Sequence, residues 1–171
     1  MRSRGNFMSE TLLIPENAGK EEIYKALLPQ IEAVMSGVDD VIANMANVAA
    51  ILKQAFGFHW VGFYRTTKPA TLVLGPFQGP LACVVIPFAK GVCGAAATQQ
   101  KTQLVPDVEK FPGHIACSSL SKSEIVVPLV HKGATQFVLD IDSDRLNDFD
   151  AVDQKYLEQI VALIGKQNFA A

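Results

Sequence analysis

Two apolar stretches stand near the end of the chain: Glu124-Ile-Val-Val-Pro-Leu-Val130 and Thr135-Gln-Phe-Val-Leu-Asp-Ile-Asp142. Both are short and rich in β-branched residues, and Lys132-Gly133 lies between them, which is typical of two strands joined by a hairpin turn. Glu124 opens the first strand, and Asp140 and Asp142 close the second. Because a buried carboxylate without a partner is costly, acids at the ends of apolar strands indicate a function.

Helices are predicted at both ends of the chain. Apolar side chains recur at helical spacing over residues 20–35, and a second stripe runs from an aspartate cap at position 39 or 40 to a stop at Gly57. A last helix starts near Asp148 or Asp150. A short helix is expected after Gly91.

The remaining strands complete the expected fold. They are predicted at residues 59–65, 71–75 and 81–87, with a short one near Gln103. Helices at both ends of a mostly antiparallel set of strands predict the α+β class. We expect a flexible N-terminal tail over residues 1–19 and a single domain over residues 20–171.

Composition excludes several classes of protein. A length of 171 residues with 49% apolar residues suits one domain with a packed core. The net charge is −2 and no basic run is present, so we expect no nucleic acid partner. No apolar stretch reaches the roughly 18 residues that cross a bilayer, and the start lacks the apolar block of a secretory signal. We therefore expect no membrane association and a cytoplasmic location.

Three cysteines lie within residues 83–117 and are all the thiols of the chain. An odd number in a reducing compartment argues against a disulfide framework, and it leaves inert core thiols, a metal site or redox catalysis. Cys83 is predicted on a strand, and taken by itself it is predicted to be a core residue. Cys93 is predicted in the first turn of a helix, whose positive end favours a thiolate. Cys117 is predicted in a polar, accessible loop.

A zinc site is the second interpretation of these thiols. His114 lies three residues before Cys117, and the three cysteines would complete a set of three sulfur ligands and one nitrogen ligand. The chain has no Cys-x-x-Cys pair, however, and the gap between Cys83 and Cys93 is uncommon for zinc. We therefore expect neither a metal nor a cofactor.

Seven motifs then point to a family. They occur in the order Trp60-Val-Gly-Phe-Tyr64, Leu74-Gly-Pro-Phe-Gln-Gly79, Leu81-Ala-Cys83, Ile86-Pro-Phe-Ala-Lys-Gly-Val-Cys-Gly94, Gly113-His-Ile-Ala-Cys117, Ser123-Glu-Ile-Val126 and Leu139-Asp-Ile-Asp-Ser143. Together they resemble the free methionine-(R)-sulfoxide reductases, a branch of the GAF domains, over about residues 22–165. The resemblance implies a GAF-like fold.

The resemblance also implies a reaction. Cys117 takes the role of the thiolate that attacks free methionine-(R)-sulfoxide, which leaves a sulfenic acid on Cys117 and releases methionine. Cys83 matches the resolving thiol that forms a disulfide with it, and Cys93 is a second candidate or a relay. Thioredoxin or a related dithiol then reduces the disulfide. The resemblance is also compatible with a homodimer.

The same resemblance implies a binding pocket. Asp140 and Asp142 are two residues apart on a strand and face the same way, and the resembling fold places Glu124 beside them. Their mutual repulsion is expected to raise the pKa of at least one acid. We assign Glu124 and Asp142 to the sulfoxide oxygen and Asp140 to the substrate ammonium. Trp60 and Tyr64 match positions that contact the methyl group and the side-chain carbons of the substrate.

Two other functions stay open at the level of sequence. Most domains of the resembling fold bind regulatory ligands without chemistry, so a ligand-sensing GAF module is one alternative. A zinc-stabilised binding protein is the other.

Overall fold

A computed structural model describes residues 11–115 and 119–169. The elements in chain order are α1 (Lys20–Met35), α2 (Val41–Phe56), β1 (Trp60–Lys68), β2 (Thr71–Gln78), β3 (Val85–Pro87), α3 (Gly91–Gln99), β4 (Gln103–Val105), the short 3-10 helix η1 (Val108–Lys110), β5 (Ser123–His131), β6 (Ala134–Ser143) and α4 (Ala151–Phe169).

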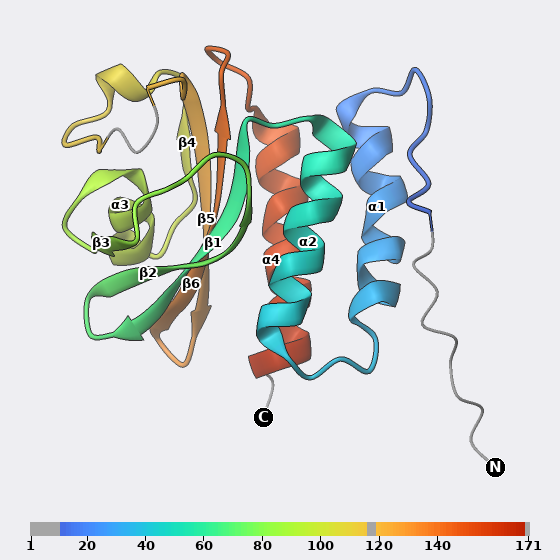
Figure 1. Ribbon diagram of the computed structural model, residues 1–171, viewed down its shortest axis with the longest axis horizontal. Helices are drawn as coiled ribbons and strands as arrows, with labels where there is room; N and C mark the ends of the chain where they lie inside the picture. The colour runs from blue at the N-terminus through green and yellow to red at the C-terminus, as the bar shows by residue number, and fades with distance from the viewer. Residues whose placement is uncertain (1–10, 116–118, 170–171) are drawn as a thin grey trace.

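One six-stranded sheet forms the middle layer, with strand order β3-β2-β1-β6-β5-β4. Every neighbouring pair of strands is antiparallel. Helices α2 and α4 cover one face of the sheet, α1 packs outside them, and α3 lies on the opposite face (Figure 1). The prediction of an α+β fold with a mostly antiparallel sheet flanked by the terminal helices is confirmed.

Two apolar cores form because side chains alternate along the strands. On β1, Val61 and Phe63 point into the core beneath α1, α2 and α4. Trp60 and Tyr64 point to the other face, where a second core forms with α3. The second core carries the candidate site, and the first core supports the strands that position it.

Helix α2 begins and ends where the sequence predicts. The Asp40 side chain accepts hydrogen bonds from the backbone N–H groups of Ile42 and Ala43, at 2.8 and 3.0 Å. This is the contact expected of an N-cap aspartate. Gly57 ends the helix with a left-handed backbone, φ 67°.

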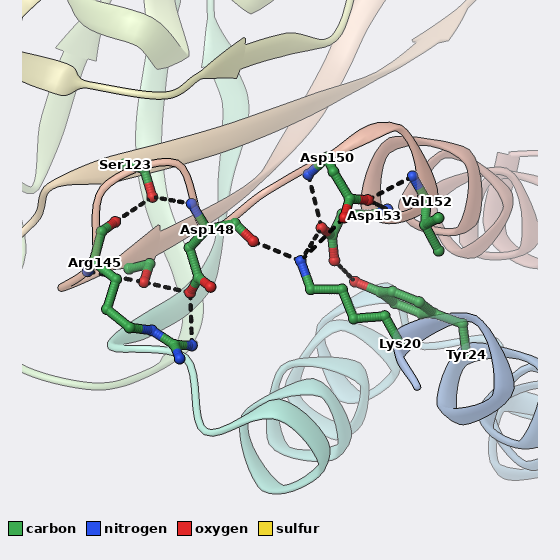
Figure 2. Close-up of polar contacts among 9 residues, drawn as sticks. Lys20, Tyr24, Ser123, Arg145, Asp148, Asp150, Val152 and Asp153 are labelled. Carbon is green, nitrogen blue, oxygen red and sulfur yellow. Dashed lines mark hydrogen bonds and ion pairs between the residues drawn. The ribbon is translucent and has the colours of Figure 1, made fainter. Parts of the chain in front are cut away.

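A polar network joins α1 to the start of α4 (Figure 2). The Lys20 ammonium lies 2.6 Å from the Asp153 carboxylate. The Tyr24 hydroxyl donates to the other oxygen of Asp153 at 2.9 Å. Residues 11–19 run along α1, where the Leu13 N–H donates to the Gln30 side chain at 2.8 Å.

One predicted strand is largely wrong. Within residues 81–87, only Val85–Pro87 forms a strand, and residues 81–84 form a loop. Side chains take the place of backbone partners here: the Tyr64 hydroxyl donates to the Cys83 carbonyl, and the Trp60 indole N–H donates to the carbonyl of Pro80, just before the segment. The 3-10 helix Val108–Lys110 was not predicted. Among the described helices, none combines the length and the apolar character required to span a membrane.

Candidate active site

The strand register places the acidic and aromatic residues on one face of the sheet. Asp142 on β6 lies between Trp60 on β1 and Glu124 on β5. Asp140, two residues earlier, lies opposite Gly62 on β1. Residues directly opposite one another share a face, so the three carboxylates and the indole point to the same side.

Two glycines make room for the Trp60 indole, and sequence reasoning missed both. A Cβ atom at Gly62 would lie 2.3 Å from the Trp60 ring, and a Cβ at Gly79 would lie 2.6 Å from it. Gly79 also has a φ of 140°, a conformation that favours glycine. The ring therefore lies flat against the sheet, with Tyr64 stacked at 5.9 Å and Phe77 at 5.4 Å between ring centroids. The signal in the sequence is the glycine two residues after the tryptophan.

These residues surround a cavity of about 50 Å³. Its floor is the sheet, and its wall includes the first turn of α3. The lining residues that carry polar or aromatic side chains are Trp60, Tyr64, Cys93, His114, Ser121, Glu124, Asp140 and Asp142. The sequence did not predict His114 or Ser121 in this pocket. His114 was predicted only as a possible metal ligand, and Ser121 lies before the strand pattern that begins at Glu124.

The cavity raises the pKa of all three acids. Burial raises the pKa of Glu124 well above its usual value, and the charges of Asp140 and Asp142 raise it further. Burial and the charge of Asp142 raise the pKa of Asp140 in the same way. Burial raises the pKa of Asp142 to about 6, against a hydrogen bond from Ser121 that lowers it. Repulsion between carboxylates therefore contributes, as predicted, but desolvation is the larger cause.

Asp140 has an unused hydrogen-bonding atom. Its side chain is 6% exposed, and its Oδ1 has no hydrogen-bond partner within the described structure. Hydrogen bonds with Cys93 and Glu124 lower the pKa of Asp140 and so favour its ionised form. A buried carboxylate oxygen without a partner is costly, and a cation entering the cavity would remove that cost.

Cys93 lies in the first turn of α3, as predicted, but its thiolate is not favoured. The residue is 4% exposed, and burial followed by the charges of Asp140 and Glu124 raises its pKa well above the usual value. Desolvation and two acids outweigh the positive end of the helix. The expectation of an activated thiolate at Cys93 is therefore wrong.

The other two cysteines differ in what the structure describes. Cys83 lies in the loop between β2 and β3, where its carbonyl accepts a hydrogen bond from Tyr64 at 3.0 Å, and it is disulfide-bonded. The prediction that Cys83 lies on a strand is wrong, because β3 begins at Val85. Cys117 lies outside the described residues.

A metal-binding arrangement exists within the described part of the chain, but it is not the predicted zinc set. One ligand atom each of Cys93, Glu124 and Asp140 lies within 4.8 Å of the others. Cys83 takes no part in this group. The three side chains are buried acids and a thiol of raised pKa, so a metal ion would have to displace their protons.

The sequence matches the GAF domain family over residues 36–166. It is 45% identical over 158 residues to the free methionine-R-sulfoxide reductase of Saccharomyces cerevisiae, covering 88% of each chain. It is 59% identical over 157 residues to GAF domain-containing protein A of Dictyostelium discoideum, covering 92% of this chain and 99% of that protein. The chain belongs to the free methionine-R-sulfoxide reductase family of GAF domains.

A solved structure of this reductase family supports the assignment. The X-ray structure of free methionine-R-sulfoxide reductase from Neisseria meningitidis in complex with its substrate superposes with a TM-score of 0.89 at 50% identity. The match covers 92% of this chain and 94% of that one. The resemblance inferred from the seven motifs and the GAF-like fold that it implied are both confirmed.

Proposed function

We propose that this protein is an oxidoreductase that reduces free L-methionine-(R)-sulfoxide to L-methionine with cysteine thiols. The observation that carries the proposal is the buried Asp140 oxygen without a partner, in a cavity beside carboxyl groups of raised pKa. Such a pocket offers an acceptor for an ammonium and a donor for an oxygen. The family membership of the chain supports the proposal as well, because a solved relative is described as a free methionine-R-sulfoxide reductase in complex with its substrate.

The substrate is bound through both of its polar ends in this proposal. The ammonium donates to Asp140, which is the acid that the hydrogen bonds of Cys93 and Glu124 hold towards the ionised form. Glu124, whose pKa is raised well above its usual value, donates its proton to the sulfoxide oxygen, and Asp142 assists it. Trp60 and Tyr64 contact the methyl group and the side-chain carbons.

Cys117 carries out the attack. Its thiolate attacks the sulfoxide sulfur while an acid protonates the oxygen, which weakens the sulfur–oxygen bond. The oxygen ends on Cys117 as a sulfenic acid, and methionine leaves as the reduced thioether. The Cys83 thiol then condenses with the sulfenic acid, which releases water and leaves a disulfide.

Cys83 is favoured over Cys93 as the resolving thiol. Cys83 is disulfide-bonded, whereas Cys93 carries a buried free thiol that lines the cavity. Burial and neighbouring acids raise the pKa of Cys93 and disfavour its thiolate. We assign Cys93 a positioning role instead, in which its thiol donates to Asp140 and orients that carboxylate.

The cycle needs an external source of two electrons. A thioredoxin-type dithiol reduces the disulfide by exchange and is itself oxidised. We place the reaction in the cytoplasm, because a reducing compartment keeps such a dithiol available. We further propose that residues 20–171 act as one catalytic domain, that no cofactor is needed, and that the domain works as a homodimer.

Methionine release from each sulfoxide diastereomer, free and within a peptide, tests this function. We expect release from the free R form only. Cys117→Ser should abolish release, and Cys83→Ser should allow one turnover per chain but no recycling. Binding of the sulfoxide without any release would favour a ligand-sensing module, and full turnover by Cys117→Ser would contradict the assigned attack.

A further inference from the structure

An apolar surface surrounds Cys83 on the outside of the molecule. Leu81 is 90% exposed, Val84 is 62% exposed and Val85 is 56% exposed. We call these three residues the Cys83 face. Single exposed apolar residues are normal on a protein surface, but three within five positions on both sides of one cysteine are more than isolated cases, and groups of exposed apolar residues mark interaction sites.

The Cys83 face is held in a defined position rather than presented by a loose loop. The Tyr64 hydroxyl donates to the Cys83 carbonyl at 3.0 Å, and the Leu74 N–H donates to the Val84 carbonyl at 2.9 Å. Val85 pairs with Val73 across the β2–β3 ladder. Ile86, directly after the face, is 5% exposed and anchors β3 in the second core. The exposed side chains are thus preorganised, which lowers the entropic cost of binding.

The face lies at an edge of the sheet. Strand β3 is the last strand on its side of the described sheet. Figure 1 shows β3 and α3 on the side of the sheet away from α1. An edge strand beside exposed apolar side chains can be approached by a second protein without displacing a helix.

The chemistry of recycling brings a reductant to this place, and this step rests on the proposed function. A reductant thiolate attacks the Cys83 sulfur, forms a mixed disulfide and releases the Cys117 thiolate. The second thiol of the reductant then attacks the mixed disulfide, which frees Cys83 and leaves the reductant as a disulfide. Two electrons pass to the protein. During attack, the residues on both sides of Cys83 must contact the reductant.

We propose that the Cys83 face is the docking surface for a protein dithiol reductant whose own thiol pair lies in an apolar surface. Cys83 is disulfide-bonded and only partly buried, and it lies in the chain between the exposed Leu81 and Val84. This position selects the occupant, because another partner would have no use for a reducible bond beside the contact. The apolar side chains of the Cys83 face supply binding affinity, and the Cys83 sulfur takes part in thiol–disulfide exchange with the reductant.

Two electron sources separate docking from chemistry. With thioredoxin, its reductase and NADPH as the probe, we expect Val84→Asp to raise the KM for thioredoxin about tenfold or more, because it places a charge in the centre of an apolar contact. With dithiothreitol, a small dithiol that needs no docking surface, the rate should change by less than about twofold, as for ordinary surface substitutions. Val84 does not line the cavity.

Two further variants complete the design. Leu13→Asp is the matched control, because Leu13 is 72% exposed and is bonded to α1 on the far side of the molecule, and it should leave both rates unchanged. Val85→Ser should raise the KM for thioredoxin by a smaller factor, about threefold.

An unchanged KM in Val84→Asp would overturn the docking proposal. An altered oligomeric state of Val84→Asp in sedimentation would overturn it too, because the face would then join two copies of this chain. Loss of methionine release with both electron sources in the unmodified protein would refute the proposed function instead.

Discussion

Two buried aspartates of this protein are treated in opposite ways. Asp153, at the junction of α1 and α4, is fully buried and accepts from the Lys20 ammonium at 2.6 Å, the Tyr24 hydroxyl at 2.9 Å and the Asp150 N–H at 2.9 Å (Figure 2). Asp140, in the cavity, is 6% exposed and leaves one oxygen without a partner among the described residues. The fold supplies a cation and hydrogen-bond donors to the first carboxylate, and the second is the one that we propose binds the substrate ammonium.

The partners of a buried acid separate a structural role from a functional one. A buried charge with a cation and hydrogen bonds contributes to the native structure, and breaking it is destabilising. A buried acid without a cation raises the free energy of the folded state and persists where function requires it. Burial does not distinguish them, since both are buried. The partners do.

The largest expected effect comes from Asp140→Asn. Asp140 is the proposed acceptor of the substrate ammonium, so the loss of its carboxylate should lower kcat/KM for free methionine-(R)-sulfoxide about 100-fold or more. The free energy of unfolding should stay unchanged or rise, because an amide at this position removes the cost of burying an acid whose pKa the cavity raises. Steady-state kinetics and urea unfolding of the same preparation measure both quantities.

Asp144→Asn is the matched control for this variant. Asp144 is an exposed aspartate shortly after β6, so the same chemical change there should alter neither activity nor stability. If Asp140→Asn instead unfolds readily and keeps its kcat/KM, Asp140 is a structural acid and the comparison with Asp153 fails.

Asp153→Asn should show the reverse pattern. The amide places an N–H group among donors and leaves Lys20 without its closest anion, so we expect a loss of about 3 kcal/mol in the free energy of unfolding. The folded fraction should keep its activity, because the network lies across the sheet from the cavity (Figures 1 and 2). Unfolding in urea with the Asp144→Asn control measures the loss, and an unchanged midpoint would refute a stabilising role.

Much of this fold could be predicted from side-chain periodicity. The period of two in residues 135–142 placed Asp140 and Asp142 on one face, and the structure shows them on the cavity side with Glu124. The caps at Asp40 and Gly57 fixed α2. These features are local, so a single sequence contains them.

Features that depend on distant contacts could not be predicted in this way. The segment before β3 has a strand-like composition, but Trp60 and Tyr64 bond to its carbonyls from another strand. Cys93 begins a helix, and its burial under Asp140 and Glu124 depends on how α3 packs against β5 and β6. The environment of a residue is a property of the packed structure rather than of its neighbours in the chain.

A smaller effect is expected in the pH dependence of stability, through the titration of Asp142 in the cavity. Burial raises the pKa of Asp142 from 3.8 to about 6, so the folded state holds a proton that the unfolded state releases between these values. Stability from this group is therefore present below about pH 4 and is lost as pH rises through 6. Relative to Asp142→Asn, the wild-type protein without substrate should lose about 2 kcal/mol between pH 4 and 7. Urea unfolding across this range tests it. A relative gain in stability with rising pH would mean that Asp142 is paired like Asp153.

The smallest expected effect concerns Cys93, which borders the acid that lacks a cation. Its thiol hydrogen-bonds to Asp140, so Cys93→Ala should raise the KM for free methionine-(R)-sulfoxide about three- to tenfold with little change in kcat, the worth of one hydrogen bond. Cys93→Ser keeps a donor of similar size at that position and should restore a KM close to wild type. Neither variant should impair recycling by thioredoxin, because Cys83 is the proposed resolving thiol. If Cys93→Ser completes one turnover and then stops, Cys93 is an electron relay, and its burial beside Asp140 serves the disulfide cycle rather than the orientation of the carboxylate.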